Sequence, residues 1–134
     1  DLLGGQFDMM CDQTTGTTNQ IKGGKIKGYA ATTLTRLKVL PELPTLDESG
    51  LKGFEATAWH AMWAPKGVPK DAIDKLVTAL QFALKDETVI KRFAELGTEP
   101  VPLDKATPQA LKAHLQAEVA KWSPVIKASG AKGN

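Results

Sequence analysis

The sequence predicts an α/β fold in which short strands and turns come first and long amphipathic helices follow. The segment 53–65, bounded by Gly53 and Pro65, is rich in aromatic and small apolar residues and carries little charge. This composition is typical of a buried strand, which we place at 54–63. The residues before it alternate short extended runs with turns, whereas those after it repeat apolar residues at helical spacing. We therefore expect this strand to connect two structural regions, with strands too widely spaced in sequence to form simple hairpins.

Three short elements are predicted at the beginning of the chain. Apolar and polar residues alternate over 6–12, which indicates a strand. Hydroxyl and carboxylate side chains come next, and the pair Gly23 and Gly24 is a typical helix stop. We therefore expect a short helix that begins near Thr14. The segment 27–33 is small and β-branched enough to form a second strand.

The residues that precede the central strand are expected to be mostly loop. Two prolines make 34–44 an extended loop, which carries Arg36. In 45–50, Thr45 occupies a capping position and Glu48 follows three residues later, so this segment is predicted to form a single capped turn.

Long amphipathic helices are predicted after the central strand. The first occupies 69–85, with Pro69 at its first helical position. Asp86 can cap the second helix, which Gly97 ends. Their apolar residues recur at helical spacing: Ile73, Leu76, Val77, Leu80, Ala83 and Leu84 in the first, and Val89, Ile90, Phe93 and Leu96 in the second.

The end of the chain is predicted to contain one more strand and one more helix. A short strand is a candidate at 98–101. Thr107 and Pro108 start a last long helix. Pro124 should kink or break this helix, because the ring removes a hydrogen bond and crowds the preceding turn.

Composition and charge exclude several classes of function. Of the 134 residues, 42% are hydrophobic and 24% charged, as in an ordinary globular domain. The formal net charge of +2 gives no reason to expect nucleic acid or an anionic membrane as a partner. Cys11 has no second cysteine for a disulfide or a metal site, and we expect it to be a buried thiol. No apolar run approaches the roughly 20 residues that span a bilayer.

The first residues suggest that other sequence precedes them. There is no initiator Met and no basic-then-apolar leader, so a signal peptide, if the gene encodes one, lies upstream of Asp1. Residues 1–5 are typical of the end of a helix followed by a glycine stop.

Catalytic motifs are mostly absent, and the most informative local feature runs from Asp12 to Thr18. A helix that begins at the end of a strand presents unpaired N–H groups and a partial positive charge, which suit a carboxylate or another small anion. Thr14 and Thr15 could add hydroxyl donors, and Asp12 could hold water or receive a ligand ammonium. The simpler hypothesis, which the sequence favours, is that Asp12, Thr14 or Thr15 only caps the helix.

Aromatic residues and histidines give weaker signals. Alternation places Trp59 and Trp63 on one face of the central strand. There they could form an apolar wall against a ligand, but aromatic residues at such positions more often pack in the core. His60, on the other face, is more typical of a hydrogen-bonded structural residue than of a base. His114 is interpreted as a surface or boundary residue. Arg36 could reach a carboxylate, although an arginine in such a loop is usually solvated or paired.

Six segments occur in an order that is seen in one known family. They are DLLGGQFDMMCD (1–12), IKGGK (21–25), LPELPT (40–45), GFE (53–55), APKGVP (64–69) and KWSPVIK (121–127). In this order they resemble the Bug, or TctC-like, extracytoplasmic solute-binding proteins of tripartite tricarboxylate transporters. The resemblance covers essentially the whole chain and corresponds to the C-terminal half of such a protein.

The resemblance implies an incomplete type II periplasmic-binding-protein-like fold, the C-terminal portion of a two-lobed molecule that closes on a small carboxylate. Residues 1–57 would then belong to lobe two, on the side of the ligand cleft. Residues 58–134 would form the C-terminal part of lobe one. The strand 54–63 would return the chain from the second lobe to the first.

The resemblance also implies how the ligand is held and where. Family ligands are gripped largely by backbone amides of two loops and by ordered water, and the main loops lie in the N-terminal portion. The positions that map onto this chain are Asp12, Gln13, Thr14, Thr15 and Trp59. Cys11, Gln13 and His60 depart from the commoner family pattern, which leaves the ligand identity open.

The resemblance implies a periplasmic, non-catalytic binding protein without a cofactor or a metal, whose partners are a small carboxylate and the membrane subunits of a transporter. An isolated chain would leave apolar sheet edges and helix faces uncovered. We therefore expect a homo-oligomer or an association with a companion N-terminal fragment. The alternative function, from another class, is a truncated interaction or sensory module that transports nothing.

Overall fold

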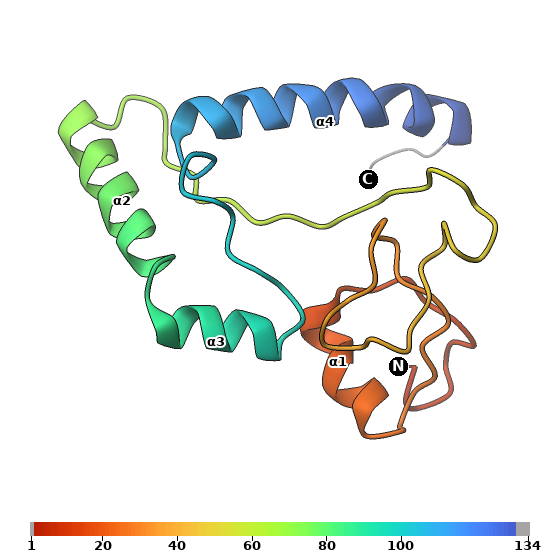
Figure 1. Ribbon diagram of the computed structural model, residues 1–134. Helices are drawn as coiled ribbons and strands as arrows, with labels where there is room; N and C mark the ends of the chain where they lie inside the picture. The colour runs from red at the N-terminus through yellow and green to blue at the C-terminus, as the bar shows by residue number, and fades with distance from the viewer. Residues whose placement is uncertain (1, 131–134) are drawn as a thin grey trace. The chain divides into compact units, whose positions relative to one another are not determined.

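The computed structural model describes residues 2–130, which divide into two compact units (Figure 1). The first unit comprises Asp1–His60 and Asp86–Pro100, and the second comprises Ala61–Lys85 and Val101–Asn134. The predicted lobe boundary after residue 57 lies close to the first of these crossings. The return of 86–100 to the first unit was not foreseen, and the assignment of the units to lobes stays a prediction. Predictions that include Asp1 or residues 131–134 extend outside the described residues.

Within residues 2–130 the structure contains four helices. They are α1 (Thr14–Lys22), α2 (Lys70–Ala83), α3 (Glu87–Glu95) and α4 (Pro108–Ser129). Each begins within two residues of its predicted start, and α1, α2 and α3 also end within two residues of their predicted ends. Gly23 follows α1, and Gly97 follows α3 with a φ of 74°, a left-handed conformation that glycine adopts without strain.

Side chains next to the chain start α3 and α4. The Asp86 carboxylate accepts hydrogen bonds from the backbone N–H groups of Thr88 and Val89, at 2.8 and 3.2 Å from Oδ1. The Thr107 hydroxyl accepts one from the N–H of Ala110, at 3.2 Å. The cap predicted for Asp86 and the helix start predicted at Thr107 are both confirmed. Each side chain satisfies N–H groups that have no partner within the helix.

The first helical position predicted for Pro69 was wrong, and so was a break of the last helix at Pro124. Pro69 occupies the N-cap of α2, with a φ of −56°, and not the first helical position. Pro124 lies inside α4, which runs without a break from Pro108 to Ser129. A proline removes one hydrogen bond from the helix, and in a helix of this length the other residues maintain the ladder around it.

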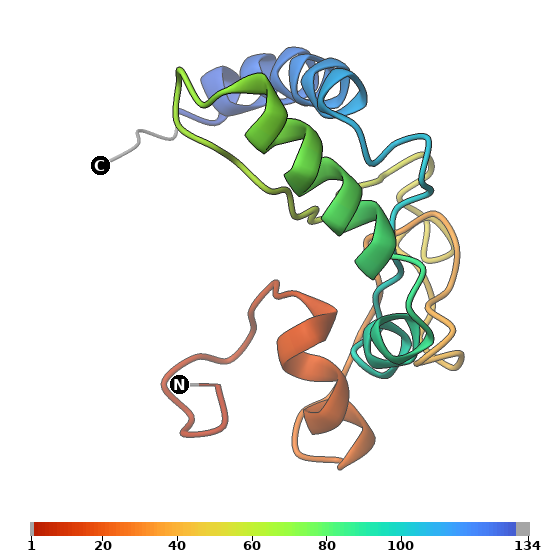
Figure 2. The same ribbon diagram turned by 90° about the vertical axis from the view of Figure 1, so that its left-hand side faces the viewer.

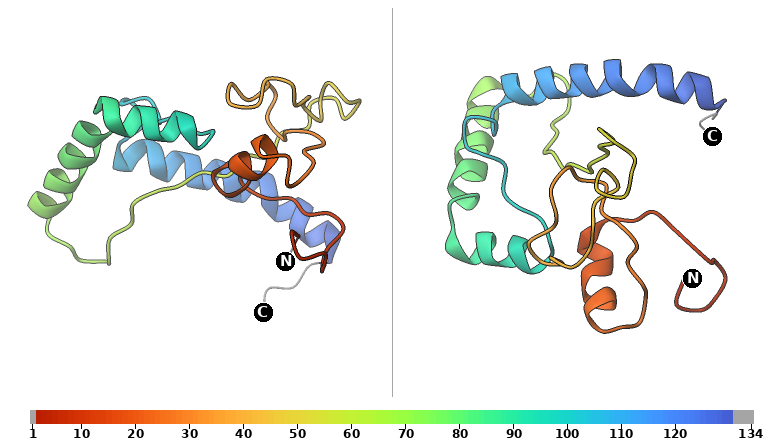
Figure 3. Two further views of the ribbon diagram at one scale, coloured as in Figure 1. Left: turned by 90° about the horizontal axis from the view of Figure 1, so that it is seen from below. Right: turned by 45° about the vertical axis from the view of Figure 1, so that its right-hand side comes forward.

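Three predicted strands, at 6–12, 54–63 and 98–101, do not form within the described residues. These segments are drawn as plain trace, without arrows (Figures 1 and 3). The alternation of side chains that suggested strands is real, but a strand also needs a neighbouring backbone to pair with. Among residues 2–130 these segments form no ladder of such pairs, although the N–H of Ala56 makes a single backbone hydrogen bond to Thr32. The predicted strands were therefore wrong for this chain.

The fourth predicted strand, 27–33, is reduced to one isolated parallel bridge between Ala31 and Thr45. The N–H of Ala31 donates to the carbonyl of Pro44 at 2.8 Å, and the N–H of Leu46 donates to the carbonyl of Ala31 at 2.9 Å. This bridge fastens the middle of the first unit, where Ala31 and Thr45 are both buried.

The central stretch is exposed, which contradicts the prediction that it is buried. Phe54 is 42% exposed and Trp63 is 62% exposed, and Trp59 is also exposed. The interpretation of the two tryptophans as core packing was therefore wrong. Figure 2 shows this stretch as an extended trace. In the first unit it is held at Ala56, whose N–H donates to the Thr32 carbonyl at 3.0 Å and whose carbonyl accepts from the Thr32 hydroxyl at 2.6 Å.

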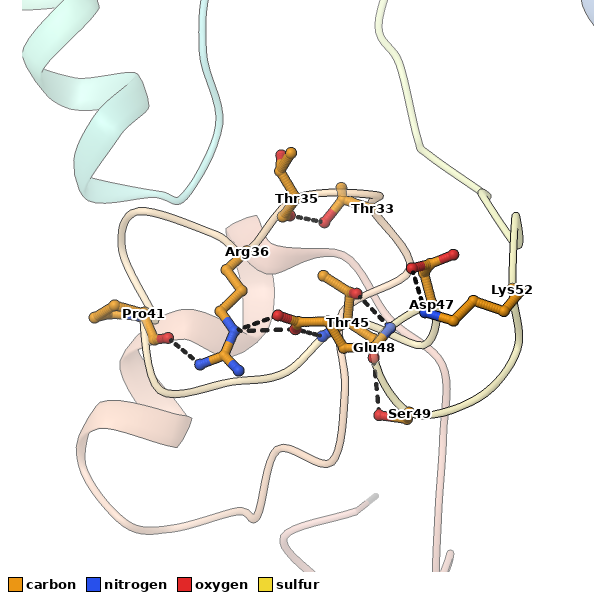
Figure 4. Close-up of polar contacts among 9 residues, drawn as sticks. All are labelled: Thr33, Thr35, Arg36, Pro41, Thr45, Asp47, Glu48, Ser49 and Lys52. Atoms are coloured by element: carbon orange, nitrogen blue, oxygen red, sulfur yellow. Dashed lines mark hydrogen bonds and ion pairs between the residues drawn. The ribbon is translucent and has the colours of Figure 1, made fainter.

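The predicted capped turn at 45–50 is confirmed in atomic detail (Figure 4). The Glu48 carboxylate accepts from the backbone N–H of Thr45 at 2.8 Å, and the Thr45 hydroxyl accepts from the N–H of Glu48 at 3.1 Å. The Arg36 Nε contacts both Glu48 oxygens at 3.0 Å, and another guanidinium nitrogen donates to the Pro41 carbonyl at 3.1 Å. Arg36 is thus paired, and it holds the 34–44 loop against the turn.

Hydrogen bonds and charges shift the acidity of two carboxyl groups in this turn. The N–H of Thr45, together with Arg36, lowers the pKa of Glu48. The N–H of Gly53, 2.8 Å from Oδ1, together with Lys52, lowers the pKa of Asp47. Both shifts arise because these donors stabilise the charged carboxylate.

Candidate functional site

The N-terminus of α1 carries no side-chain cap. Gln13 is the N-cap residue, with extended backbone angles of φ −80° and ψ 146°, and its side chain makes no capping hydrogen bond. The favoured hypothesis, in which Asp12, Thr14 or Thr15 caps this helix, was therefore wrong. The Gln13 carbonyl accepts from the N–H of Gly16 at 3.2 Å and from the Thr17 hydroxyl at 2.9 Å. Because no side chain occupies the helix end, the N–H groups of Thr14 and Thr15 are left for water or a ligand.

The Asp12 carboxylate lies beside the first turn of α1 without capping it. Its Oδ1 accepts from the N–H of Gln13 at 2.8 Å. Its Oδ2 lies 3.7 Å from the position that a Cβ on Gly16 would occupy. A negative charge close to the positive end of the helix is favourable. The Asp12 carboxylate can also accept a hydrogen bond from a hydroxyl or an ammonium group of a ligand whose own carboxylate binds the helix end.

Thr14 attaches the start of α1 to the end of α3. Its hydroxyl donates to the carbonyl of Gly97 at 3.1 Å, across 83 residues of sequence. Figure 1 shows the C-terminal end of α3 beside the start of α1. The Thr14 hydroxyl proton therefore points at Gly97, which removes it from the set of donors available to a ligand. This contact fixes where the α1 N-terminus lies within the first unit.

Gly97 fits tightly into this contact. A Cβ at Gly97 would lie 2.7 Å from Val39 Cγ1 and 3.1 Å from the Thr18 hydroxyl oxygen. Thr18 is 2% exposed, and its hydroxyl is buried without a hydrogen-bond partner. We call the contact of Thr14, Thr18, Val39 and Gly97 the α1 seat. It needs a residue without a side chain at position 97, both for space and for the positive φ.

The other two predicted site residues are exposed. Thr15 lies on the first turn of α1, and Trp59, 36% exposed, lies on the extended stretch of the same unit. The structure thus gathers Asp12, Gln13, Thr14 and Thr15 on one helix end and places Trp59 on a separate segment. Their role in binding a ligand stays a prediction.

The residues that position this helix end could not be identified from the sequence. Gly97 was predicted as a helix stop, but nothing in a single sequence signals that it contacts Thr14 and Val39. The same is true of Lys38, whose ammonium lies 2.6 Å from the Glu99 carboxylate and joins the 34–44 loop to the segment after α3. The hydrogen bond to Glu99, followed by the charge attraction, raises the pKa of Lys38.

Other features of the described residues do not form a site. A shallow, open hollow of about 510 Å³ lies along α2, on the unit that does not contain α1, and is lined by Asp74, Lys75, Thr78, Ala79 and Phe82. A ligand pocket is usually enclosed and draws polar groups from several elements, whereas this hollow belongs to one helix. Residues 2–130 contain no cluster of three metal-ligating side chains and no helix that could cross a membrane.

Cys11 and the histidines occupy the surface of the described chain. Cys11 is exposed, so the prediction of a buried thiol was wrong. His60 is exposed, which does not favour a structural role in a core, whereas the surface position predicted for His114 is confirmed.

The sequence matches a described protein family over most of its length. Residues 1–131 match the TctC family, described as the tripartite tricarboxylate transporter family receptor. One curated relative, the UPF0065 protein in the TAR-I ttuE-ttuC' intergenic region of Agrobacterium vitis, is 55% identical over 130 residues. The match covers 97% of this chain and 38% of that relative.

Solved structures extend the similarity to three dimensions. The periplasmic binding protein BugD is 51% identical, with a TM-score of 0.93, over 100% of this chain and 44% of its own. MatC from Rhodopseudomonas palustris with bound malate is 34% identical, with a TM-score of 0.88, over 93% of this chain and 42% of its own. Rpa4515 of R. palustris with adipate is 31% identical, with a TM-score of 0.88, over 97% of this chain and 42% of its own.

These similarities confirm the predicted fold class. The chain has a periplasmic-binding-protein fold of the α/β class, of which it spans less than half of the length seen in the solved relatives. From its match over residues 1–131, the chain belongs to the TctC family of tripartite tricarboxylate transporter receptors.

Proposed function

We propose that this chain forms part of an extracytoplasmic solute-binding protein that captures a small carboxylate in the periplasm for a tripartite tricarboxylate-type transporter. Membership of a receptor family supports this function. The relatives solved with malate and with adipate support a dicarboxylate as the class of ligand. The partners in transport would be the membrane subunits of that transporter.

The single observation that carries the proposal is the open N-terminus of α1. The helices α3 and α4 use the side chains of Asp86 and Thr107 to satisfy their first N–H groups, whereas α1 and α2 do not use a side chain. Of these two open ends, only that of α1 carries the predicted binding residues. A ligand carboxylate can supply the missing acceptor, and the helix dipole favours its negative charge. The proposed binding residues are Asp12, Gln13, Thr14, Thr15 and Trp59.

Each proposed residue has a distinct part in holding the ligand. The backbone N–H groups that follow Gln13 donate to one ligand carboxylate, and the exposed Thr15 hydroxyl adds a donor. Asp12 receives a hydroxyl group, such as the one that malate carries, and disfavours a second negative charge at the same position. Thr14 acts through the α1 seat, and Trp59 supplies an apolar wall. Closure of a two-lobed protein requires that these contacts be stronger in the closed state than in the open state.

An NMR titration of the 134-residue chain tests the proposal. Malate, adipate and citrate should shift the backbone amide signals of Thr14 and Thr15. The N–H groups of Thr88 and Val89 already donate to the Asp86 carboxylate, so they provide an internal control. Their amide signals should not shift. Succinamide, which is neutral, controls for the charge of the ligand. If no acid shifts the amide signals of Thr14 and Thr15, or if the α1 and α3 amides shift alike, the α1 N-terminus is not the binding site.

The proposal also includes a protein partner, because large apolar side chains are exposed throughout the described residues. A second copy of the chain and a companion polypeptide are the two candidates. An interaction module without a transport function is the alternative, and it predicts a protein partner without any response to carboxylates. Titration with the acids in the presence and absence of that partner distinguishes the two functions.

A further inference from the structure

Positive charge is unevenly distributed along the chain, although the formal net charge is only +2. Residues 13–41 contain four lysines and one arginine but no aspartate or glutamate, whereas the whole chain has 15 acidic residues. Two of these cations are paired with carboxylates from later segments, because Arg36 contacts Glu48 and Lys38 contacts Glu99. The other three are Lys22, Lys25 and Lys27. A nearly balanced total therefore hides a local excess of positive charge.

These three lysines lie at the end of α1 and on the turn that follows it, where Figure 1 shows the chain reversing its direction. All three are exposed, and within the described part of the chain no carboxylate pairs with them. The Lys27 ammonium lies 4.9 Å from the centre of the Tyr29 ring, a cation–π contact, and Tyr29 is 67% exposed. We call this surface the α1 basic turn, which consists of Lys22, Lys25, Lys27 and Tyr29.

Hydrogen bonding and packing hold the backbone of the α1 basic turn. The N–H of Gly24 donates to the Ile21 carbonyl at 3.0 Å, and Gly24 has the positive φ, 67°, that is common just after a helix. A Cβ at Gly28 would lie 3.0 Å from Leu43 Cδ1 and 3.4 Å from Ile21 Cδ1, so the segment after the turn packs against other parts of the first unit. A surface that is already ordered loses little conformational entropy when it binds a partner.

A simpler interpretation is that the lysines only stabilise α1 and keep its surface solvated. It accounts for Lys22, which lies in the last turn of α1, where the helix dipole favours a cation. It does not account for Lys25 and Lys27, because the effect of the dipole falls off within the last turn of a helix. Like charges that are close together repel one another, and an acidic partner would offset that repulsion.

The composition of the α1 basic turn favours an acidic protein segment over an anionic membrane. Electrostatic binding to a membrane surface typically uses clusters of about four to eight basic residues, often with a large apolar anchor. The α1 basic turn has three lysines, and its aliphatic residue, Ile26, is half-buried. Tyrosine, in contrast, is enriched at interfaces between proteins. The exposed ring of Tyr29 can pack against a partner while the lysines contact its carboxylates.

We propose that the α1 basic turn is a docking surface for an acidic segment of a partner protein. The nine residues of α1 separate this surface from the α1 N-terminus by about 13 Å, so a partner can dock there without covering the proposed carboxylate site. The acidic chemistry of the partner follows from the turn itself. Only the identity of the partner, a membrane subunit of the transporter, rests on the proposed function.

Binding of a synthetic peptide to the 134-residue chain tests the proposal. The probe is a short, dye-labelled peptide rich in Asp and Glu, and its control has Asn and Gln in their place. At an ionic strength of about 0.15 M, fluorescence anisotropy should show saturable binding of the acidic peptide only, and this binding should weaken as salt is added. Vesicles of phosphatidylcholine and phosphatidylglycerol should not sediment with the chain. The proposal fails if the acidic peptide does not bind saturably, or if the chain binds the vesicles and the peptide does not displace it.

Matched triple variants locate the surface. Replacing the three lysines of the α1 basic turn by Gln should weaken peptide binding by about 10-fold or more, because each replacement removes one charge pair with the peptide. The control removes the same amount of charge from the second unit and should weaken binding by less than about twofold. It replaces three exposed lysines without a carboxylate partner among the described residues: Lys75→Gln, Lys85→Gln and Lys112→Gln. Equal effects of the two triple variants would show that the peptide responds to net charge and not to the α1 basic turn.

Two further measurements separate docking from folding and from ligand binding. Far-UV circular dichroism of each triple variant must match that of the unsubstituted chain. Malate should shift the amide signals of Thr14 and Thr15 equally in both triple variants, because the α1 basic turn lies at the other end of the helix. Peptide binding without a response to malate would support the docking surface and contradict the carboxylate site. A response to malate without peptide binding would contradict the docking surface alone.

Discussion

The helices α1 and α3 start in different ways, although both belong to the first unit and have similar lengths. Asp86, next to α3 in sequence, caps that helix with its own carboxylate. The helix α1 has no such cap, and its position is set by Gly97, which accepts from the Thr14 hydroxyl 83 residues away. A helix end that is fixed by tertiary contact can leave its N–H groups open, and this is what an anion-binding helix requires.

The substitution with the largest expected effect on this difference is Gly97→Ala. The added Cβ would lie 2.7 Å from Val39 Cγ1 in a backbone with a φ of 74°, so both packing and conformation oppose it. We expect the free energy of unfolding to fall by about 2–4 kcal/mol, the sum of a left-handed alanine and an overpacked contact. Urea denaturation followed by circular dichroism measures this loss.

Gly24→Ala is the control for that substitution. Its φ of 67° is similar, but an added Cβ would have no atom within 4 Å. It should therefore show only the conformational cost, about 1–2 kcal/mol. If the two variants are equally destabilised, the α1 seat is not tightly packed and the comparison between α1 and α3 loses its basis.

The second test removes the local cap. Asp86→Ala deletes the acceptor of two backbone hydrogen bonds and should lower the free energy of unfolding by about 1 kcal/mol. Asp12→Ala, the same change beside α1, should cost only a few tenths of a kcal/mol, because Asp12 is exposed and bonds to Gln13 outside the helix. Hydrogen exchange at residues 88–90 and 14–16 assigns each effect to its helix. A larger loss from Asp12→Ala would mean that α1 depends on a local cap after all.

The same contrast explains how much of the fold was predictable. Local chemistry predicted the cap of α3, the start of α4, the capped turn with Thr45 and Glu48, and the stop at Gly97, because each involves residues a few positions apart. The strands at 6–12 and 54–63 were wrong for this chain, because a strand is completed by a distant backbone that the alternation of side chains does not specify.

The candidate site was predictable only in part. The segment 12–15 was found from its position before a helix, but its residues were expected to cap α1 and do not. Gly97 and Val39 were not found, because their role depends on a contact between segments far apart in the sequence. Trp59 was proposed from a resemblance, and its exposure does not by itself define a role.

A third test uses the buried hydroxyl of the α1 seat. The Thr18 hydroxyl is buried and has no hydrogen-bond partner. Folding therefore removes its hydrogen bonds to water without replacing them, which costs free energy. Thr18→Val keeps the branched shape and should raise the free energy of unfolding by about 1 kcal/mol. Thr17→Val, one position earlier, removes a hydroxyl that donates to the Gln13 carbonyl and should give no gain. A loss of stability in Thr18→Val would indicate that a water molecule bonds the hydroxyl.

A fourth test gives α1 the cap that it lacks. Gln13 has the extended backbone of an N-cap residue, so Gln13→Asp and Gln13→Asn should both stabilise α1 by about 0.5–1 kcal/mol. Their effects on malate binding should differ, because the aspartate places a negative charge where the ligand carboxylate is proposed to lie. We expect titration to show about tenfold weaker binding for Gln13→Asp than for Gln13→Asn. Equal affinities of the two variants for malate would show that the ligand carboxylate does not bind at the α1 N-terminus.

The smallest expected effect is the loss of stability at acidic pH. It should weaken the turn that carboxylates hold, at 45–50, and leave the α1 seat intact. The pKa values of Glu48 and Asp47 are lowered in the folded chain from ordinary values of 4.5 and 3.8. Their contribution to stability is therefore present above those ordinary values and is lost as the pH falls through the lowered ones. Below about pH 4 the turn 45–50 should loosen, whereas the bond between Thr14 and Gly97, which contains no titrating group, should persist.

Hydrogen exchange at acidic pH measures this difference. The amides of Thr45 and Gly53, which donate to the two carboxylates, should lose protection before the amides inside α1. Glu48→Gln removes the charge at every pH, so it should weaken the turn at pH 7 and abolish the acid-dependent step at Thr45. If α1 and the turn lose protection together in the unsubstituted chain, the first unit responds to acid as one body, and the α1 seat is not independent of the carboxylates.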